Sequence, residues 1–172
     1  MENEKMSIQD FFIFNCLEEK DLPLLHRWFQ EPHVKKWWPV PKEKEDFFDS
    51  YLKRIHSTEI SLYFVSYGNI PIGFLQAYPV DRSKETWLPK LPKNTIGIDQ
   101  FIGEIDFVGK GYGTSFIKKF IDQLLAENNE MTVILDPDPR NKAAIRCYEK
   151  VGFVRVGIFP RKGDLALLMR YN

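Results

Sequence analysis

The sequence predicts an α/β domain in which helices flank a mixed sheet. Short β-prone apolar runs alternate with segments whose apolar residues fall at helical spacing. Their order is one strand, helices, three strands, a helix, a strand, a helix and two strands, which is typical of this class. With 172 residues, 44% of them apolar and 28% charged, the chain can bury a real core, and we expect one domain over residues 1–172.

The N-terminal third is expected to hold one strand and three helical segments. Residues 11–17 are apolar and β-prone. The acidic stretch 18–21 opens a helix, since acids in a first turn suit the helix dipole. That helix has an apolar face formed by Leu22, Leu25, Trp28 and Phe29. A short helix at 31–38 and a longer one at 42–56 follow.

The middle of the chain predicts a hairpin and a third strand. Residues 60–67 and 70–78 are β-prone and flank Gly68-Asn69, a pair suited to a tight turn. The polar, proline-containing stretch 79–94 is expected to be a loop with Trp87 in its middle, and 95–102 is the next strand.

The last part predicts two helices and three strands. Residues 112–126 have apolar side chains at helical spacing, and 141–150 form the second helix. Between them, 131–135 is a buried strand. Residues 153–159 and 165–171 are the final two strands.

Three glycines stand between the strand 95–102 and the helix that follows: Gly109, Gly111 and Gly113. Glycine lets a backbone approach a ligand, and the first N–H groups of a helix have no internal partner, so this turn favours a phosphate or pyrophosphate. A flexible turn with no ligand is the alternative. The Walker and Rossmann patterns are both absent, since Gly113 precedes Thr114-Ser115 and the glycine spacing differs.

The overall composition excludes several classes of protein. The formal net charge is zero, so no global field favours nucleic acid or an anionic membrane. Cys16 and Cys147 lie far apart and match no metal spacing, which indicates reduced thiols. The polar start at residues 1–5 has no signal-peptide core, and no run could span a bilayer. We expect a cytoplasmic protein with no metal, nucleic-acid or membrane partner.

Two segments resemble the GNAT superfamily of acetyl-CoA-dependent N-acetyltransferases. Residues 108–114 are similar to the family's pyrophosphate-binding turn, although Val108 stands where Gln or Arg is usual. Residues 141–153 resemble its Asn-x-x-Ala-x-x-x-Tyr-x-x-x-Gly-Phe segment. The element order agrees along the whole chain. The resemblance implies the GNAT fold, with a mixed and mostly antiparallel central sheet flanked by helices, and acetyl-CoA as the cosubstrate.

Further residues resemble the aminoglycoside 6′-N-acetyltransferases within this superfamily. They are His33 with Trp37-Trp38, Gly97-Ile98-Asp99-Gln100, and residues 136–141 running into 144–150. The resemblance implies an antibiotic-resistance enzyme, a monomer or homodimer, that acetylates the 6′-amine of an aminoglycoside by direct transfer in a ternary complex. Cys147 has no His-Asp pair at a suggestive position, which also favours direct transfer over an acyl-enzyme.

Asp99 and Tyr148 are the expected catalytic residues. Asp99 lies in an otherwise apolar strand, where a carboxylate needs a partner or a task. We expect it to bind the substrate ammonium and remove its proton; a solvent-facing strand carboxylate is the alternative. Tyr148 resembles the residue that hydrogen-bonds or protonates the departing CoA thiolate, and the alternative is a tyrosine packed on the core.

The resemblance also implies the binding residues. Backbone N–H groups of the glycine turn would hold the pyrophosphate. A backbone N–H near the end of the strand 95–102 would bind the thioester oxygen. Asn141 would contact the pantetheine arm, and the alternative is that it only caps its helix. The expected cofactor-binding residues are Phe101, Ile102, Val108, Gly109, Lys110, Gly111, Tyr112, Gly113, Thr114, Asn141 and Tyr148. The expected substrate-binding residues are Trp37, Trp38, Trp87, Asp99 and Asp136, with Asp136 on a second ammonium and the tryptophans against sugar rings.

One feature departs from an aminoglycoside site. A polycation needs an acidic cleft, yet the loop around Trp87 is net basic, with Lys84, Glu85, Lys90 and Lys93. Acids elsewhere could restore the balance: Glu45, Asp46, Asp49, Asp99, Asp136 and Asp138. A polyamine, a protein N-terminus or a siderophore precursor is therefore the alternative acceptor, and a non-catalytic acyl-CoA-binding domain is the alternative from another class.

Overall fold

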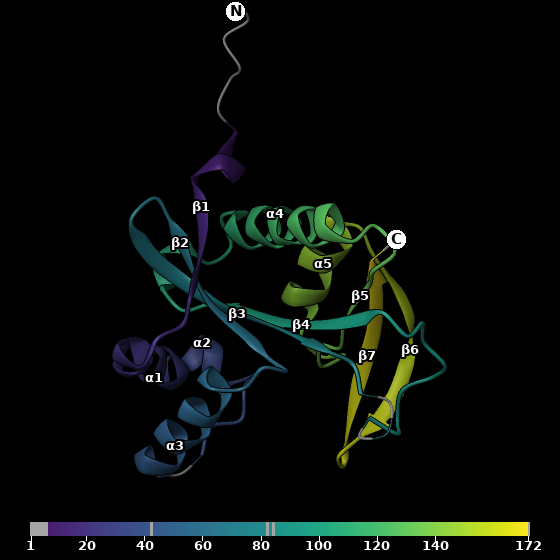
Figure 1. Cartoon of the computed structure of the whole chain (residues 1–172), viewed down its shortest axis with the longest axis horizontal. Helices are drawn as coiled ribbons and strands as arrows, with labels where there is room; N and C mark the ends of the chain where they lie inside the picture. Colours follow the sequence, from purple (N-terminus) through teal and green to yellow (C-terminus); the bar gives the residue numbers. More distant parts are fainter. Residues whose placement is uncertain (1–6, 42, 82, 84, 172) are drawn as a thin grey trace, which may run out of the picture.

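The structure is a computed structural model that describes residues 7–41, 43–81, 83 and 85–171. Lys42, the expected start of the third helix, and Lys84 of the expected basic loop lie outside these residues. Seven described strands form one sheet in the order β1-β2-β3-β4-β5-β7-β6 (Figure 1). Their bounds are β1 Phe12–Cys16, β2 Ser61–Tyr67, β3 Ile70–Pro79, β4 Thr95–Ile102, β5 Thr132–Leu135, β6 Phe153–Arg161 and β7 Asp164–Tyr171.

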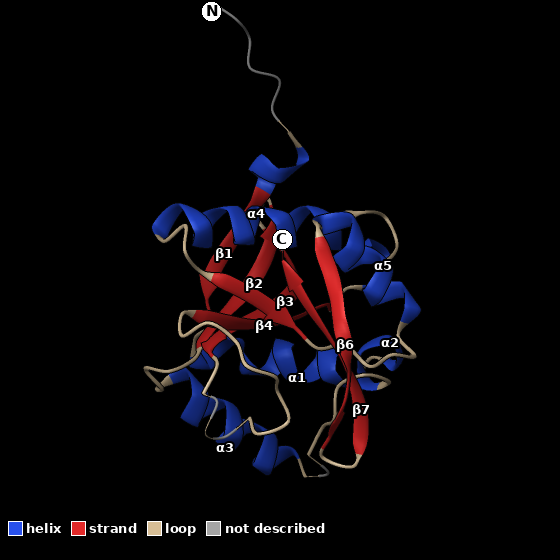
Figure 2. Cartoon of the chain, turned by 90° about the vertical axis from the view of Figure 1, so that its right-hand side faces the viewer, coloured by secondary structure: helices blue, strands red, loops and turns tan. Residues whose placement is uncertain are grey.

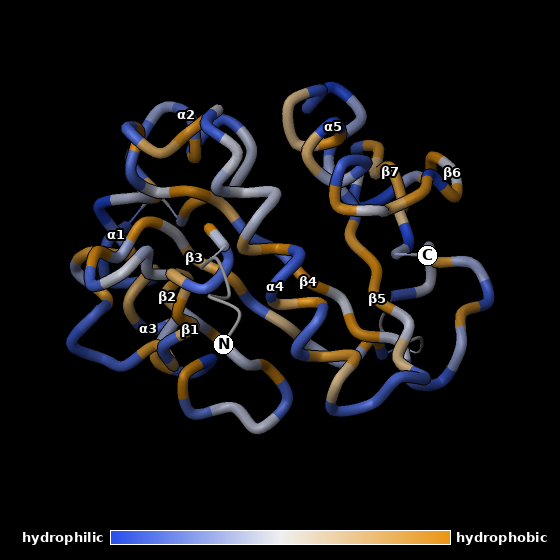
Figure 3. The backbone as a smooth tube through the Cα atoms, turned by 90° about the horizontal axis from the view of Figure 1, so that it is seen from above, coloured by the Kyte–Doolittle hydropathy of each residue, from blue (hydrophilic) through white to orange (hydrophobic). Residues whose placement is uncertain are grey.

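The sheet is mixed and mostly antiparallel, which confirms the predicted class. Strands β1 to β4 pair antiparallel in sequence order, and β5, β7 and β6 form a second antiparallel group. The only parallel pair among the described strands is β4 with β5, and its register covers just Thr95–Gly97 against Thr132–Ile134. Beyond Gly97 the two groups diverge, as Figure 1 and the view from above in Figure 3 show.

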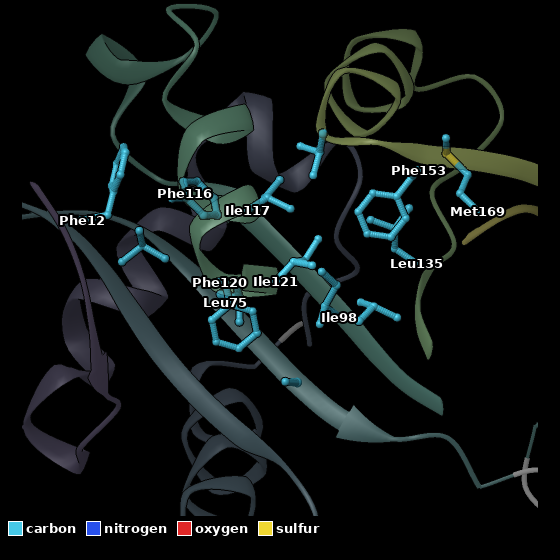
Figure 4. Packing of buried hydrophobic residues seen from close by; sticks show 14 of the residues in the cluster. Phe12, Leu75, Ile98, Phe116, Ile117, Phe120, Ile121, Leu135, Phe153 and Met169 are labelled. Carbon is cyan, nitrogen blue, oxygen red and sulfur yellow. The ribbon is translucent and has the colours of Figure 1, made fainter. Parts of the chain in front are cut away.

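Helices cover both faces of the sheet (Figure 2). Helices α1 (Leu22–Gln30), α2 (Pro32–Lys35) and α3 (Lys44–Ile55) lie on one side, and α4 (Tyr112–Glu127) and α5 (Lys142–Val151) lie on the other. The four apolar residues predicted for α1 are all buried. Helix α4 likewise buries one apolar face against β3 and β4, as Phe116, Ile117 and Ile121 show beside Leu75 and Ile98 in Figure 4.

Several element boundaries differ from the predicted ones. Helix α2 ends at Lys35, before Trp37-Trp38, and β6 continues past Phe159 to Arg161. Phe11 belongs to a 3₁₀ turn, Ile8–Phe11, which Ser7 caps by accepting the Gln9 N–H at 3.2 Å. The acids expected in the first turn of α1 instead form a separate 3₁₀ turn, Glu19–Asp21. An Asp21 carboxylate oxygen accepts the N–H of Glu18, the residue before this turn, at 2.9 Å, and the hydrogen bond closes the turn. None of the described helices is both long and apolar enough to cross a bilayer.

The end of β4 is anchored to α1. A Cβ on Gly103 would lie 2.1 Å from the Trp28 ring, so only glycine allows this approach. The Trp28 indole donates to Glu104 Oε1 at 2.8 Å, and Arg27 pairs with the same oxygen. These contacts hold the last residues of β4, which lead into the glycine turn, against a buried helix.

Candidate acetyl-transfer site

The site begins at the open side of β4. The Gly103 N–H donates to Ile72 of β3 at 2.8 Å. Because alternate backbone groups of a strand point to the same side, the N–H groups of Phe101 and Asp99 also face β3, and those of Ile102 and Gln100 face away from it. His33 confirms the direction, since its Nε2 contacts the Ile102 carbonyl at 2.9 Å. The register therefore favours Ile102 over Phe101 for contact with a ligand in the gap between β4 and β5.

The glycine turn ends at this open side. Gly109 and Gly111 have φ values of +75° and +89°, which residues with a side chain rarely adopt. A Cβ on either glycine would meet open space. Gly111 is the N-cap of α4, with no side-chain cap bond. The first bond of the helix runs from the Ser115 N–H to the Gly111 carbonyl, so the N–H groups before Ser115 remain for a ligand. The turn therefore presents backbone N–H groups in an arrangement that suits an anion.

Side chains around this turn mainly support it. The Tyr112 ring packs on Phe12 and Tyr67 in the core, with ring centres 6.1 and 4.9 Å apart. The Thr114 hydroxyl contacts the Cys147 sulfur at 3.3 Å, which joins α4 to α5. Val108 and Lys110 are exposed, and a Cβ added to Gly113 would lie in ordinary contact with Cys147 and Ile102. Recognition at these expected cofactor residues would thus come from the backbone.

Asn141 caps α5 as expected. Its Oδ1 accepts the Ala144 N–H at 3.2 Å. The cap uses the amide oxygen, so Nδ2 is the group of this side chain that could reach a pantetheine oxygen.

Asp99 lies on the α1–α3 face of β4, partly buried beside the gap. Gln76 on β3 donates to Asp99 Oδ2 at 2.7 Å. Burial raises the pKa of Asp99 above its usual value, while the Gln76 hydrogen bond, Arg161, Tyr78 and Arg54 lower it. Burial prevails, and the result is a carboxylate with increased basicity. The solvent-facing alternative does not describe this side chain.

The residues that hold Asp99 were not among those predicted from the sequence. Gln76 is buried, and its Oε1 accepts from Arg54 at 3.3 Å, which fixes the amide so that its NH₂ faces Asp99. The Tyr78 ring lies over Gly97, where a Cβ would be 2.5 Å from Tyr78 Cε2. Gln76 was detectable, since an amide inside the apolar run 70–78 is the same signal that identified Asp99.

Tyr148 approaches the gap from the opposite face. It lies on α5 in the core cluster that also contains Ile98, whereas the Phe101 ring joins the cluster under α1–α3. Burial, followed by the nearby Cys147 and Asp99, raises the pKa of Tyr148 well above its ordinary value. The phenol therefore keeps its proton at neutral pH and can donate it.

Asp136 lies in a pocket with Tyr78, Glu85, Trp87 and Arg161. Its carboxylate forms an ion pair with the Arg161 guanidinium. Burial, and then the negative charge of Asp99, raise the pKa of Asp136 to about 7, against the opposing effect of Arg161. Two carboxylates thus share one side of the gap, and an arginine that the sequence analysis did not identify accompanies them.

The three tryptophans of the predicted sugar walls have different environments. Trp38 packs on Phe29 and Phe101, with ring centres 5.6 and 5.1 Å apart, and belongs to the core. The Lys36 ammonium lies 4.8 Å from the Trp37 ring centre. Trp87 donates to Glu85 Oε2 at 2.5 Å and lines the Asp136 pocket, so it is the one placed beside the predicted acids.

Comparisons with known proteins identify the family of this chain. Residues 18–160 match the acetyltransferase (GNAT) domain family. The chain is 30% identical to aminoglycoside N(6′)-acetyltransferase type 1 of Klebsiella pneumoniae, over 93% of this chain and 82% of the relative. It superposes with a TM-score of 0.82 and 29% identity on AAC(6′)-Ib in complex with ribostamycin and coenzyme A, covering 95% and 94% of the two chains. The kanamycin complex with coenzyme A gives a TM-score of 0.81 at 30% identity, covering 94% of each. The predicted acetyl-CoA cosubstrate agrees with these complexes, and the chain belongs to the GNAT acetyltransferase family.

Proposed function

We propose that this chain transfers the acetyl group of acetyl-CoA to the 6′-amine of aminoglycosides by direct attack in a ternary complex. The observation behind the reaction type is the position of Asp99, a partly buried carboxylate of increased basicity, on the face of the sheet opposite the neutral phenol of Tyr148. The acceptor class follows from relatives about 30% identical that are named for 6′-acetylation of aminoglycosides.

The backbone between the end of β4 and the start of α4 would hold acetyl-CoA, which supplies the activated acetyl group. The N–H groups at Gly109 to Thr114 would bind the pyrophosphate. The Ile102 N–H faces the gap and would bind the thioester oxygen, where negative charge develops during transfer. Asn141 Nδ2 would contact the pantetheine arm.

Asp99 and Tyr148 divide the proton transfers. An amine attacks only when it is neutral, so the ammonium must first lose a proton, and Asp99 accepts it directly or through water. A pKa raised above the ordinary aspartate value suits this task near neutral pH. Tyr148 donates its proton, or a hydrogen bond, to the departing sulfur.

The state of Cys147 favours direct transfer over an acyl-enzyme. A cysteine attacks as the thiolate. Burial raises the pKa of the Cys147 thiol, against the Thr114 contact and Lys150, so the nucleophilic form is disfavoured at neutral pH. We also expect a cytoplasmic location, a monomer or homodimer, and one domain over the chain, as the sequence predicts.

One observation favours the alternative acceptors. The ion pair between Arg161 and Asp136 reduces the negative charge available to a polycation. A polyamine or another amine with fewer positive charges would meet less competition at Asp136.

The decisive measurement is release of free thiol from acetyl-CoA. Kanamycin and tobramycin would be compared with spermidine, a short peptide and an aminoglycoside that has a hydroxyl at the 6′ position. Turnover of the two antibiotics that is absent with the 6′-hydroxyl compound is expected. Turnover of spermidine or peptide alone would keep the mechanism and refute the aminoglycoside acceptor, and equal turnover of the 6′-hydroxyl compound would refute the regiochemistry.

Two variants test the catalytic roles. Asp99→Asn should retain acetyl-CoA affinity and lose most turnover. Tyr148→Phe should slow transfer without weakening acceptor binding. Parent-like turnover of Asp99→Asn would remove this carboxylate from the mechanism, and a Tyr148→Phe rate equal to the parent's at every pH would remove the phenol.

A further inference from the structure

Arg161 lies in the acceptor pocket in the way that a bound cation would. Its guanidinium contacts the Asp136 carboxylate and lies over the Trp87 ring, 5.5 Å from the ring centre. The Asp136 carboxylate and the Trp87 ring are the groups that the sequence analysis predicted for a substrate ammonium and the sugar that bears it. A side chain of the protein therefore occupies this position.

The Arg161 contact is held by charge and stacking, without a full set of hydrogen bonds. Within the described residues, Arg161 Nε is a buried atom with no hydrogen-bond partner, and Asp136 Oδ2, also buried, has the ion pair with Arg161 Nη1 as its contact. The Asp136 side chain is only 8% exposed, so its carboxylate depends on a nearby cation. A ligand ammonium could supply that charge and donate a hydrogen bond to the same carboxylate.

The position of Arg161 in the fold allows it to leave the pocket. It is the last residue of β6, directly before the two-residue turn Lys162-Gly163, whose φ values are +48° and +87°. Its side chain is 36% exposed, so rotation about its own bonds would bring the guanidinium into water. No movement of the strand is needed.

We propose that Arg161 is a specificity-determining residue that occupies the second-ammonium subsite of the acceptor pocket, so that a polycationic acceptor binds there only by displacing it. The inference rests on the proposed function, since it assumes that the acceptor enters beside Asp99 and Asp136. Acceptors with a single ammonium leave Arg161 in place. Acceptors with several ammonium groups must replace the contact between Arg161 and Asp136. They therefore bind more weakly than they would if Arg161 were absent.

The test is acceptor binding measured by titration calorimetry on the whole chain. The variants are Arg161→Gln and, as a control with the same change in charge, Arg140→Gln. Arg140 is an exposed neighbour that pairs with Asp138 and Asp164 and does not contact Asp136. The probes are neamine, which has several ammonium groups, and 6-amino-6-deoxyglucose, which has one. Loss of Arg161 also raises the pKa of Asp136, so titrations are run at about pH 8.5, where more of this carboxylate is ionised.

Arg161→Gln should bind neamine about tenfold tighter or better than the parent, and the single amine with little change. Arg140→Gln should leave both affinities as in the parent. Arg161→Lys, which keeps the charge, should show no gain, and Asp136→Asn added to Arg161→Gln should abolish the gain. Unchanged or weaker neamine binding by Arg161→Gln, with the unfolding transition of the variant intact, would overturn the proposal. If Arg161→Gln has lost its unfolding transition, Arg161→Thr is measured in its place.

The two proposals can fail separately. If neither the parent nor Arg161→Gln releases thiol from acetyl-CoA with any aminoglycoside, the proposed function is wrong. The neamine titration still decides whether Arg161 occupies a cation subsite, because it requires no turnover.

Discussion

Replacing Gln76 by leucine should change the pH dependence of acetyl transfer and little else. Gln76 donates to Asp99 Oδ2 at 2.7 Å, and this hydrogen bond favours the ionised carboxylate. A hydrogen bond to a charged group contributes about 1.5–3 kcal/mol, and about 1.4 kcal/mol corresponds to one pH unit. The Gln76→Leu variant should therefore raise the pKa of Asp99 by about 1–2 pH units.

The sign of the effect follows from the role of Asp99 as a base. A base works when deprotonated, so activity is lost as the pH falls through its pKa. Burial already raises the pKa of Asp99, and removal of the Gln76 bond raises it further. The acidic limb of kcat/KM should move to higher pH by about 1–2 units, while the rate above that limb stays near the parent value. Thiol release measured from about pH 5 to pH 9 detects both effects.

The control is Asn15→Leu, which removes an amide hydrogen bond from the same sheet. Asn15 Nδ2 donates to Ser66 at 3.3 Å, on strands that do not contact Asp99. Its pH profile should match the parent's. An acidic limb that stays in place in Gln76→Leu, or moves to lower pH, would refute the assignment of Asp99 as the titrating base.

Five further variants test the glycines and the cap. Gly111→Ala forces a side chain into a left-handed position at φ +89°, which costs about 1–2 kcal/mol of stability. The added Cβ would also enter the proposed pyrophosphate site, so KM for acetyl-CoA should rise about tenfold. Gly68→Ala, at φ +59° and also in open space, should lose comparable stability with no change in that KM; an equal KM in both variants would contradict the proposed pyrophosphate site. Gly97→Ala places a Cβ 2.5 Å from the Tyr78 ring, so kcat should fall while CoA affinity, measured by titration, stays unchanged, and a parent-like kcat would contradict the role of that ring. Asn141→Ala should lose about 1 kcal/mol, or ~2–4 °C in Tm; Asn141→Asp should restore Tm but not KM for acetyl-CoA, and full recovery of both would leave Asn141 with capping alone.

The elements of this fold were predictable because local pattern and tertiary packing agree. In α4 the apolar residues at helical spacing are those that bury against β3 and β4, and in the hairpin of β2 and β3 Gly68 adopts the expected left-handed turn. The errors are at element boundaries. Phe11, Glu19 and Asp21 lie in 3₁₀ turns, where the hydrogen bonds that the Ser7 and Asp21 side chains accept from the backbone outweigh propensity.

The candidate site was predictable where a single polar residue stands in an otherwise apolar strand. Asp99 did so in an apolar strand, and Gln76 would have done so under the same test. Arg161 had no such signal, because its partner Asp136 is distant in sequence. Their contact requires that β7 lie between β5 and β6 and that the loop containing Trp87 fold over the end of β6. Neither condition is visible in the strand pattern.

The gap that positions the proposed chemistry has a cause in sequence. Strand β5 has four residues against eight in β4, so β4 loses its parallel neighbour after Gly97. The strand ends at Leu135, one residue before Asp136, because Pro137 and Pro139 follow and proline cannot donate to a sheet ladder. The Pro137 carbonyl instead accepts the Leu167 N–H of β7 at 2.9 Å, which turns the chain away from β4. The prolines therefore free the outward backbone groups of Gln100 and Ile102, and they also leave Asp136 at the end of β5, facing Asp99.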